Sequence, residues 1–215
     1  MGDTFDLIAA ERRRTADFLG SLDEAQGATP SLCGRWTVRE VAAHLVMPFR
    51  LSRPQLLRRM VRHGGSFHRV SEEFAREVGR EPLGSLADDL RANAADRFTP
   101  PTLGPEAPLT DVVVHTLDMR VPLGAGTGDV AAEALDTVLA FLRTPKAARG
   151  FVPKARTAGL SFRSTDTSWS DGEGPEVRGP AASLALAVTG RLAGFEDLDG
   201  DGVGELRRRV GDPAA

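Results

Sequence analysis

Apolar residues recur at steps of three and four along most of the first 145 residues of this sequence. That spacing places them on one face of a helix and therefore predicts a series of amphipathic helices. The clearest are residues 3–20, the stretch from Val38 to about Arg62, and residues 71–98 with a break near Pro82. Residues 20–36 are rich in glycine, proline and serine, which predicts a loop.

The helix that starts at Val38 has a defined beginning. Thr37 and Glu40 have the spacing of a capping box, in which each side chain accepts a hydrogen bond from the other residue's backbone N–H. Pro48 lies within the same helical run and could kink or end it.

The stretch DVVVHTLDMR, residues 111–120, mixes the signals of two structures. Its three valines favour a strand. Thr110 is a suitable N-cap, and Asp111 suits the positive end of a helix dipole. We therefore expect a helix capped by Thr110, followed by another over residues 129–142.

The pattern changes after residue 143. Residues 143–157 have no periodicity and predict a linker, whereas GLSFRSTDTSWS alternates like a β-hairpin, and PEVRGP could add a short strand. Helices are expected near 181–190 and 203–210. The chain is thus expected to hold an all-helical domain at 1–145 and a small α+β domain at 155–215.

Composition describes an ordinary globular protein of 215 residues, 41% hydrophobic and 27% charged. Its net charge of -3 provides no basic field for nucleic acid. No apolar run approaches the roughly 18 residues of a membrane span, and the N-terminus lacks a signal-peptide pattern. The single cysteine, Cys33, excludes an intramolecular disulfide. We expect a cytoplasmic protein with neither a nucleic acid nor a membrane as partner.

Three side chains suggest a metal site. Asp111 and His115 are four residues apart, which puts them on one face of a helix, and His44 lies on the apolar side of the earlier helix. Buried polar groups need partners, and a divalent metal would satisfy all three. Two histidines and a carboxylate form a common zinc ligand set that leaves one position open for water or substrate.

Each of these residues also has an ordinary explanation, since an inward histidine is often a satisfied core residue. Asp118 could accept a hydrogen bond from a ligating imidazole, or pair with an arginine. Glu40 is explained by the capping box, and Cys33 is expected to be structural. His63 and His68 are expected to be solvated.

The stretch DLDGDGVGELRR resembles a calcium loop in Asp197, Asp199 and Asp201. Its twelfth position is Arg208, which puts a cation where the bidentate carboxylate belongs. We therefore interpret it as a turn before the last helix.

Three stretches together resemble the mycothiol-dependent maleylpyruvate isomerase family: CGRWTVREVAAHLV (33–46), DVVVHTLDMRVPLG (111–124) and VRGPAASLALAVTGRLAG (177–194). The resemblance implies an α plus α+β protein, with an N-terminal DinB-like four-helix bundle and a small α+β C-terminal domain. It also implies that His44, Asp111 and His115 bind a divalent metal, for which zinc is expected. Arg191 is expected to take part in catalysis.

The implied activity is thiol chemistry. A metal-bound mycothiol, or a similar low-molecular-weight thiol, would attack an electrophile, either to isomerise a maleylpyruvate-like cis-enedioate or to transfer the thiol. The family has Glu where this chain has Asp111, which leaves open a non-catalytic metal-binding or regulatory module of the same fold. The expected partners are then a small thiol and an electrophilic substrate. The protein is expected to be a monomer or a homodimer.

Overall fold

The computed structural model describes residues 3–127 and 130–211. The chain forms two compact units, Met1–Phe98 with Asp118–Gly126, and Thr99–Leu117 with Thr127–Ala215. Compactness does not test independent folding, so the domains expected at 1–145 and 155–215 stay a prediction. None of the described helices combines the length and apolar character that crossing a membrane requires.

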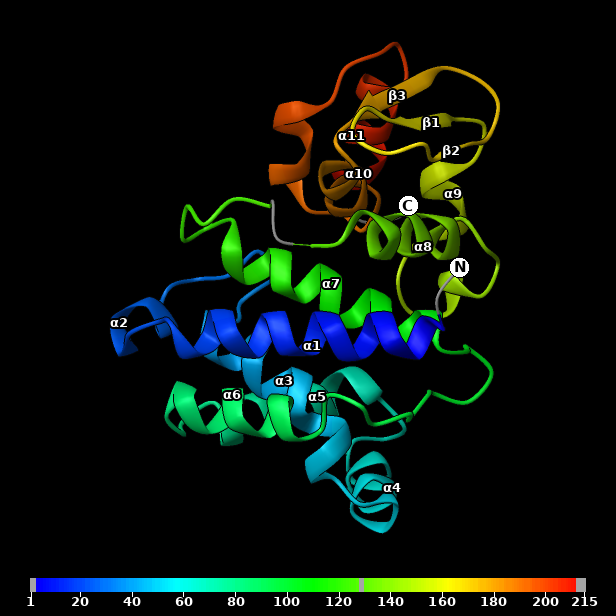
Figure 1. Ribbon diagram of the computed structural model, residues 1–215. Helices are drawn as coiled ribbons and strands as arrows, with labels where there is room; N and C mark the ends of the chain where they lie inside the picture. Colours follow the sequence, from blue (N-terminus) through cyan, green and yellow to red (C-terminus); the bar gives the residue numbers. More distant parts are fainter. Residues whose placement is uncertain (1–2, 128–129, 212–215) are drawn as a thin grey trace. The chain divides into compact units, whose positions relative to one another are not determined.

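The first unit is built from helices alone (Figure 1). Its helices are α1 (Thr4–Gly20), α2 (Glu24–Gly27), α3 (Val38–Arg50), α4 (Arg53–Arg62), α5 (Phe67–Val78) and α6 (Leu83–Ala92). Helix α1 packs on α6, and α3 packs on both α5 and α6. The amphipathic spacing explains this, because each apolar face is buried between its neighbours.

The core of this unit contains fully enclosed aliphatic side chains such as Ile8 and Leu19 from α1 and Leu86 from α6. Each contributes about 1.5–3 kcal/mol relative to an exposed position. Arg50, at the end of α3, donates a hydrogen bond of 2.7 Å to Glu81 and also pairs with Asp89 on α6. The two helices are therefore joined at their edge by charge as well as by packing.

The predicted start of α3 is confirmed. The Glu40 backbone N–H donates to Thr37 Oγ1 at 3.3 Å, and the Thr37 N–H donates to Glu40 Oε2 at 2.8 Å. Pro48 neither ends nor divides the helix, which continues to Arg50.

The second unit combines helices with a small sheet (Figure 1). It holds α7 (Glu106–Arg120) up to Leu117, α8 (Ala132–Leu142), η1 (Ala147–Arg149), α9 (Lys154–Thr157), β1 (Ser161–Ser164), β2 (Ser170–Asp171), β3 (Glu176–Gly179), α10 (Ala181–Val188), η2 (Leu192–Asp197) and α11 (Val203–Gly211). Helix α10 is buried along its whole length and contacts α8, η2 and β3. It is therefore the centre of this unit's core.

The sheet has the order β2-β1-β3. Strands β1 and β2 form the expected antiparallel hairpin, with Phe162 opposite Asp171, and β3 runs parallel to β1, with Phe162 opposite Val177. Phe162 and Val177 are both buried, so the hydrophobic positions of the alternating pattern face the core.

The expected N-cap at Thr110 is wrong, because α7 begins four residues earlier. The Thr110 hydroxyl donates to the Glu106 carbonyl at 2.8 Å, so it lies inside the helix. Pro108 did not prevent this, since the first four N–H groups of a helix have no partner within it.

Two other expectations need correction. The stretch 20–36 contains α2, which is stabilised by a capping box between Asp23 and Gln26. The expected linker 143–157 contains η1 and α9. Short turns of this kind carry too few residues to show a period. The expected start of the next helix, Asp129, lies outside the described residues, and α8 begins at Ala132.

Candidate functional site

His44 lies in the middle of α3, two turns after the capping box, and it is partly buried. Its ring centroid is 5.2 Å from that of Trp36, with the planes inclined at 44°. Trp36 is almost fully buried and directly precedes the N-cap residue Thr37. The cap and the tryptophan thus hold the imidazole in place, and Trp36 is a residue to which the sequence had assigned no role.

Asp111 and His115 lie one turn apart on α7, as their spacing predicted. The distance between His115 Nε2 and Asp111 Oδ1 is 3.5 Å. The His115 side chain is 12% exposed and that of Asp111 is 35% exposed, so the imidazole is mostly buried and the carboxylate is half-buried. The helix therefore presents a nitrogen and an oxygen donor at a single point.

This separation suits two ligands of one metal ion. Zinc binds imidazole nitrogen and carboxylate oxygen at about 2.0–2.2 Å with tetrahedral angles, which puts two ligand atoms about 3.4 Å apart. The Asp111–His115 pair has nearly that spacing. The same pair is also an ion pair when the His115 imidazole is protonated. The geometry is therefore compatible with a metal ion bound by both side chains or with a proton on the imidazole.

Asp118 and Cys33 come from separate segments of the chain that meet in the first unit. Asp118 is fully buried, and its backbone carbonyl accepts a hydrogen bond of 3.0 Å from the Leu32 N–H. Cys33 follows Leu32 and is a free, partly buried thiol. This bond fixes the loop beside Asp118, and the side-chain role predicted for Asp118 stays a prediction.

Arg191 follows Gly190, which has a positive φ of 96°, and directly precedes η2. Its Nη1 donates to the Thr189 carbonyl at 2.9 Å. Arg156 on α9 is nearby: burial, and secondarily the charge of Arg191, lower the pKa of the Arg156 guanidinium. Sequence reasoning missed Arg156, because it lay in the apparent linker.

The remaining candidates have structural partners. His63 Nε2 is 2.8 Å from Glu73 Oε2, whereas His68 is exposed. In the calcium-like loop, Asp197 accepts from Ser183 at 3.0 Å and Asp199 pairs with Arg178. These carboxylates are engaged within the second unit, which supports the reading of a turn.

Residues 8–112 match the model of a family described as the mycothiol maleylpyruvate isomerase N-terminal domain. This match covers slightly less than half of the chain, and the matched part is similar to that domain. The matched residues include His44 and Asp111, whereas His115 and Arg191 lie beyond them. The resemblance drawn from the three sequence stretches is confirmed.

Two solved structures share the fold. The crystal structure of the mycothiol-dependent maleylpyruvate isomerase is 18% identical, covers 94% of this chain and 96% of that chain, and has a TM-score of 0.55. The structure of a histidine-to-alanine mutant of the mycothiol-dependent maleylpyruvate isomerase gives the same identity and coverage with a TM-score of 0.51. Among curated protein sequences there is no significant match.

At this identity the likeness to solved structures shows the fold alone. The expected fold class is confirmed: a helical N-terminal part like that of mycothiol-dependent maleylpyruvate isomerase, followed by a small α+β part. The site residues expected from the sequence are not tested by this likeness, so they remain a prediction.

Proposed function

We propose that this chain is a metal-dependent enzyme that uses mycothiol, or a similar low-molecular-weight thiol, against an electrophilic substrate. The match of residues 8–112 to the mycothiol maleylpyruvate isomerase N-terminal domain supports the use of a thiol. The two reactions that remain open are isomerisation of a maleylpyruvate-like cis-enedioate and transfer of the thiol to an electrophile. Both begin with attack of the thiolate sulfur on an electron-poor carbon.

The proposed metal ligands are His44, Asp111 and His115, and zinc is the metal that suits them best. The observation that carries this proposal is the 3.5 Å between His115 Nε2 and Asp111 Oδ1, which is close to the spacing of two zinc ligands. The three residues also form one of the groups of side chains that could hold a metal ion. Two nitrogen donors and one carboxylate would leave a coordination position open.

A second group with suitable donors consists of Cys33, His115 and Asp118. It shares His115 with the first group but replaces His44 and Asp111 with a thiol and a buried carboxylate. We favour the first group, because Asp111 and His115 already present their donor atoms together on one helix. Replacement of Cys33 by serine separates the two, since it removes a ligand from the second group only.

A bound divalent metal supplies the positive charge that lowers the pKa of a coordinated thiol. In the isomerisation, a carbon–sulfur bond forms as the substrate double bond becomes single, the molecule rotates about that bond, and the carbon–sulfur bond breaks again. The residues of this chain would hold the substrate during rotation. Arg191 is suited to bind a substrate carboxylate through its planar guanidinium.

Arg156 would strengthen that carboxylate site. Burial, and secondarily the charge of Arg191, lower the pKa of the Arg156 guanidinium, so an anion that binds between the two charges would relieve their repulsion. The proposed role of Arg191 comes from the resemblance to the family, and the proximity of Arg156 to Arg191 supports a shared role in binding an anion.

The alternative is a non-catalytic module that keeps the fold and binds a metal or ligand. The observation that favours it is Asp111 in place of the family's Glu, because a side chain shorter by one methylene reaches less far toward a metal. Such a module would bind metal without turning over a thiol-dependent substrate.

The test is elemental analysis of the purified full chain with and without added thiol, followed by assays with mycothiol and maleylpyruvate. The proposal expects about one divalent metal per chain and turnover that depends on both metal and thiol. Metal without turnover on any thiol-dependent substrate supports the non-catalytic module. A protein that neither contains nor takes up metal contradicts the proposed site.

A further inference from the structure

Helix α4 presents two large apolar side chains to solvent, while its Leu56 and Met60 are partly buried. Leu57 is 66% exposed and Val61 is 75% exposed, and their i, i+4 spacing puts them on one side of the helix. Phe67, at the start of α5, is 50% exposed. A surface helix normally turns large apolar residues toward the core, so the exposed pair on a different side of α4 has no packing role within the described residues.

Helix α4 is held in place from one side only. None of its residues is buried, and its main contacts are with α5. Arg59 anchors it through an ion pair of 2.8 Å with Glu77 and a longer one of 3.5 Å with Glu73. Figure 1 shows α4 at the outer edge of the first unit, beyond α3 and α5.

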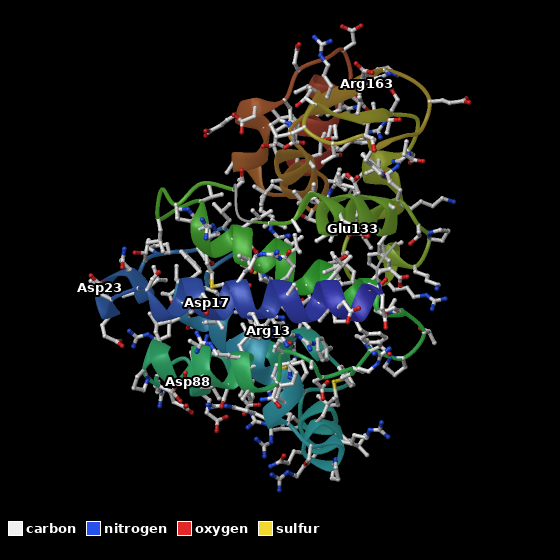
Figure 2. All side chains as sticks on the ribbon, in the orientation of Figure 1. Arg13, Asp17, Asp23, Asp88, Glu133 and Arg163 are labelled. Carbon is white, nitrogen blue, oxygen red and sulfur yellow. The ribbon has the colours of Figure 1, made fainter. Side chains whose placement is uncertain are left out.

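The segment around α4 is strongly basic within an acidic chain. The chain has a net charge of -3, yet no aspartate or glutamate occurs from residue 41 to residue 71. The same stretch contains six arginines: Arg50, Arg53, Arg58, Arg59, Arg62 and Arg69. Figure 2 shows nitrogen-tipped side chains projecting from this helix. Arg50, Arg59 and Arg62 form ion pairs with acids of neighbouring segments, so the positive charge of this stretch comes mainly from Arg53, Arg58 and Arg69.

The exposed arginines border the exposed apolar residues. Arg53 lies one turn before Leu57, and Arg58 and Arg62 directly follow Leu57 and Val61. Arg53 and Arg58 form no ion pair among the residues that the structure describes, whereas Arg62 lies 3.3 Å from Glu73. Exposed apolar side chains bordered by arginines are typical of a helix that lies on a membrane surface.

We propose that the outer face of α4, formed by Leu57, Val61, Arg53, Arg58 and Arg62 together with Phe67, docks on the surface of an anionic lipid bilayer. The guanidinium groups would bind lipid phosphates, and the three apolar side chains would enter the boundary between headgroups and acyl chains. This goes beyond the proposed function and does not depend on it. It departs from the expectation of no membrane partner, because peripheral docking needs no membrane-spanning segment.

Charge decides between the possible occupants. A second copy of the chain would bring the same arginines against each other, which repels. An acidic protein would complement the charge, but Leu57 and Val61 project from a convex helix, and a bilayer accepts projecting side chains without a matching groove. The bilayer therefore fits both the charge and the shape of this face.

The experiment is co-sedimentation of the full chain with vesicles of phosphatidylglycerol and phosphatidylcholine, compared with vesicles of phosphatidylcholine alone. We expect sedimentation with the anionic vesicles only, and its loss at high salt. The variant Arg53→Gln/Arg58→Gln should bind about thirtyfold more weakly, since each arginine near an anionic surface contributes a factor of about five. The variant Leu57→Gln/Val61→Gln should bind about tenfold more weakly.

The matched control is Arg13→Gln/Lys154→Gln, which removes the same charge from two exposed residues elsewhere. Arg13 is labelled on α1 in Figure 2. This control should sediment like the wild type, and circular dichroism should show that every variant is folded. The proposal is wrong if the wild type does not sediment with anionic vesicles, even if it binds a soluble acidic protein. It is also wrong if the control loses as much binding as the arginine variant, or if the Leu57→Gln/Val61→Gln variant loses none.

Discussion

On α7, Nε2 of His115 lies 3.5 Å from Oδ1 of Asp111. The relationship comes from the helix itself, because residues four apart project onto one face. With a proton on the imidazole the two side chains form an ion pair. With a metal ion present, both would coordinate that ion. These alternatives predict different responses to metal, and His44 on α3 is the residue that we expect to complete the metal site.

If Asp111 is a ligand, Asp111→Asn should lower metal affinity at least about tenfold, since even partners outside the ligand set contribute 10–100-fold. The helix should stay folded because the side chain keeps its size. Competition with a chromogenic chelator measures the affinity, and circular dichroism measures the helix. Asp111→Glu, which restores the family residue, should bind metal at least as tightly as the wild type.

The matched control on the same helix is Glu106→Gln, which removes a carboxylate from the first turn of α7. It should leave metal affinity unchanged. Equal affinities for wild type and Asp111→Asn would remove Asp111 from the site. Two histidines alone would then be too weak a ligand set to support catalysis.

His44→Ala should abolish metal binding. It should also lower stability mainly in the metal-loaded protein, because a ligand that binds only the native state adds about 2.7 kcal/mol at a hundredfold excess over Kd. For a chain of this length that is about 5–10 °C in Tm. The variant His44→Gln fills more of the space beside Trp36 than His44→Ala does. With chelator present, it should melt within a few degrees of the wild type.

The control for that measurement is His68→Gln, an exposed histidine on α5. It should change neither metal binding nor Tm. Equal destabilisation of the His44 variants with and without chelator would make His44 a packing partner of Trp36, 5.2 Å away, and the metal hypothesis would fail. Cys33→Ser should keep the metal, and its loss would point to the alternative ligand set.

Arg191→Gln should raise KM for a carboxylate-bearing substrate by about 10–100-fold, the range expected for a lost charged hydrogen bond. Metal content should not change. Arg191→Lys should recover only part of the loss, because an ammonium lacks the planar fork that matches a carboxylate. The control is Arg163→Gln, an exposed arginine on β1. An unchanged KM in Arg191→Gln would leave this residue structural.

Limited trypsin digestion should cut first within residues 143–157. Lys146 and Arg149 are exposed there and lie near short helical turns rather than within long ones. Mass spectrometry of the earliest fragments measures the position. Two stable fragments would support the expected domains at 1–145 and 155–215, and early cleavage inside 111–142 would show that this boundary is misplaced.

The ion pair between Arg50 and Glu81 should make a pH-dependent contribution to stability. A hydrogen bond from Arg50 lowers the pKa of Glu81 below its usual 4.5. A carboxyl whose folded pKa is lowered stabilises the protein above the unfolded pKa, and this contribution is lost as the pH falls through the folded value. Glu81→Gln should therefore lower Tm by about 1–3 °C at neutral pH, since the pair is partly exposed.

Well below pH 4.5 the wild type and Glu81→Gln should melt together, because both then carry an uncharged side chain at residue 81. Differential scanning calorimetry over a pH series measures the difference. A difference in Tm that does not vary with pH would mean that the variant acts through packing and not through charge.

The local pattern of the sequence predicted much of the helical part. The start of α3 followed from two residues, Thr37 and Glu40, whose capping hydrogen bonds lie within one turn. The common face of Asp111 and His115 followed from four-residue spacing. The start of α7 was missed, because Pro108 reads as a loop residue although the first turn of a helix tolerates it.

Interactions between distant segments had no such signal. Nothing in the spacing of the hairpin strands shows that β3 pairs in parallel with β1, because pairing depends on how the connecting chain packs. Arg156 lay in an apparent linker, and its proximity to Arg191 is a product of the fold. Helix α4 had a helical pattern, but the pattern could not show which of its faces the other helices leave uncovered.

The sequence by itself determined the helical N-terminal part, the hairpin and the residues proposed for the site, because caps, periods and four-residue spacing act over one or two turns of backbone. Only the tertiary structure decided that Trp36 lies against the His44 ring and that Arg156 lies near Arg191. It also decided that Leu57 and Val61 remain exposed. These depend on which apolar faces bury one another, and that choice is made by packing over the whole unit rather than by any short stretch of chain.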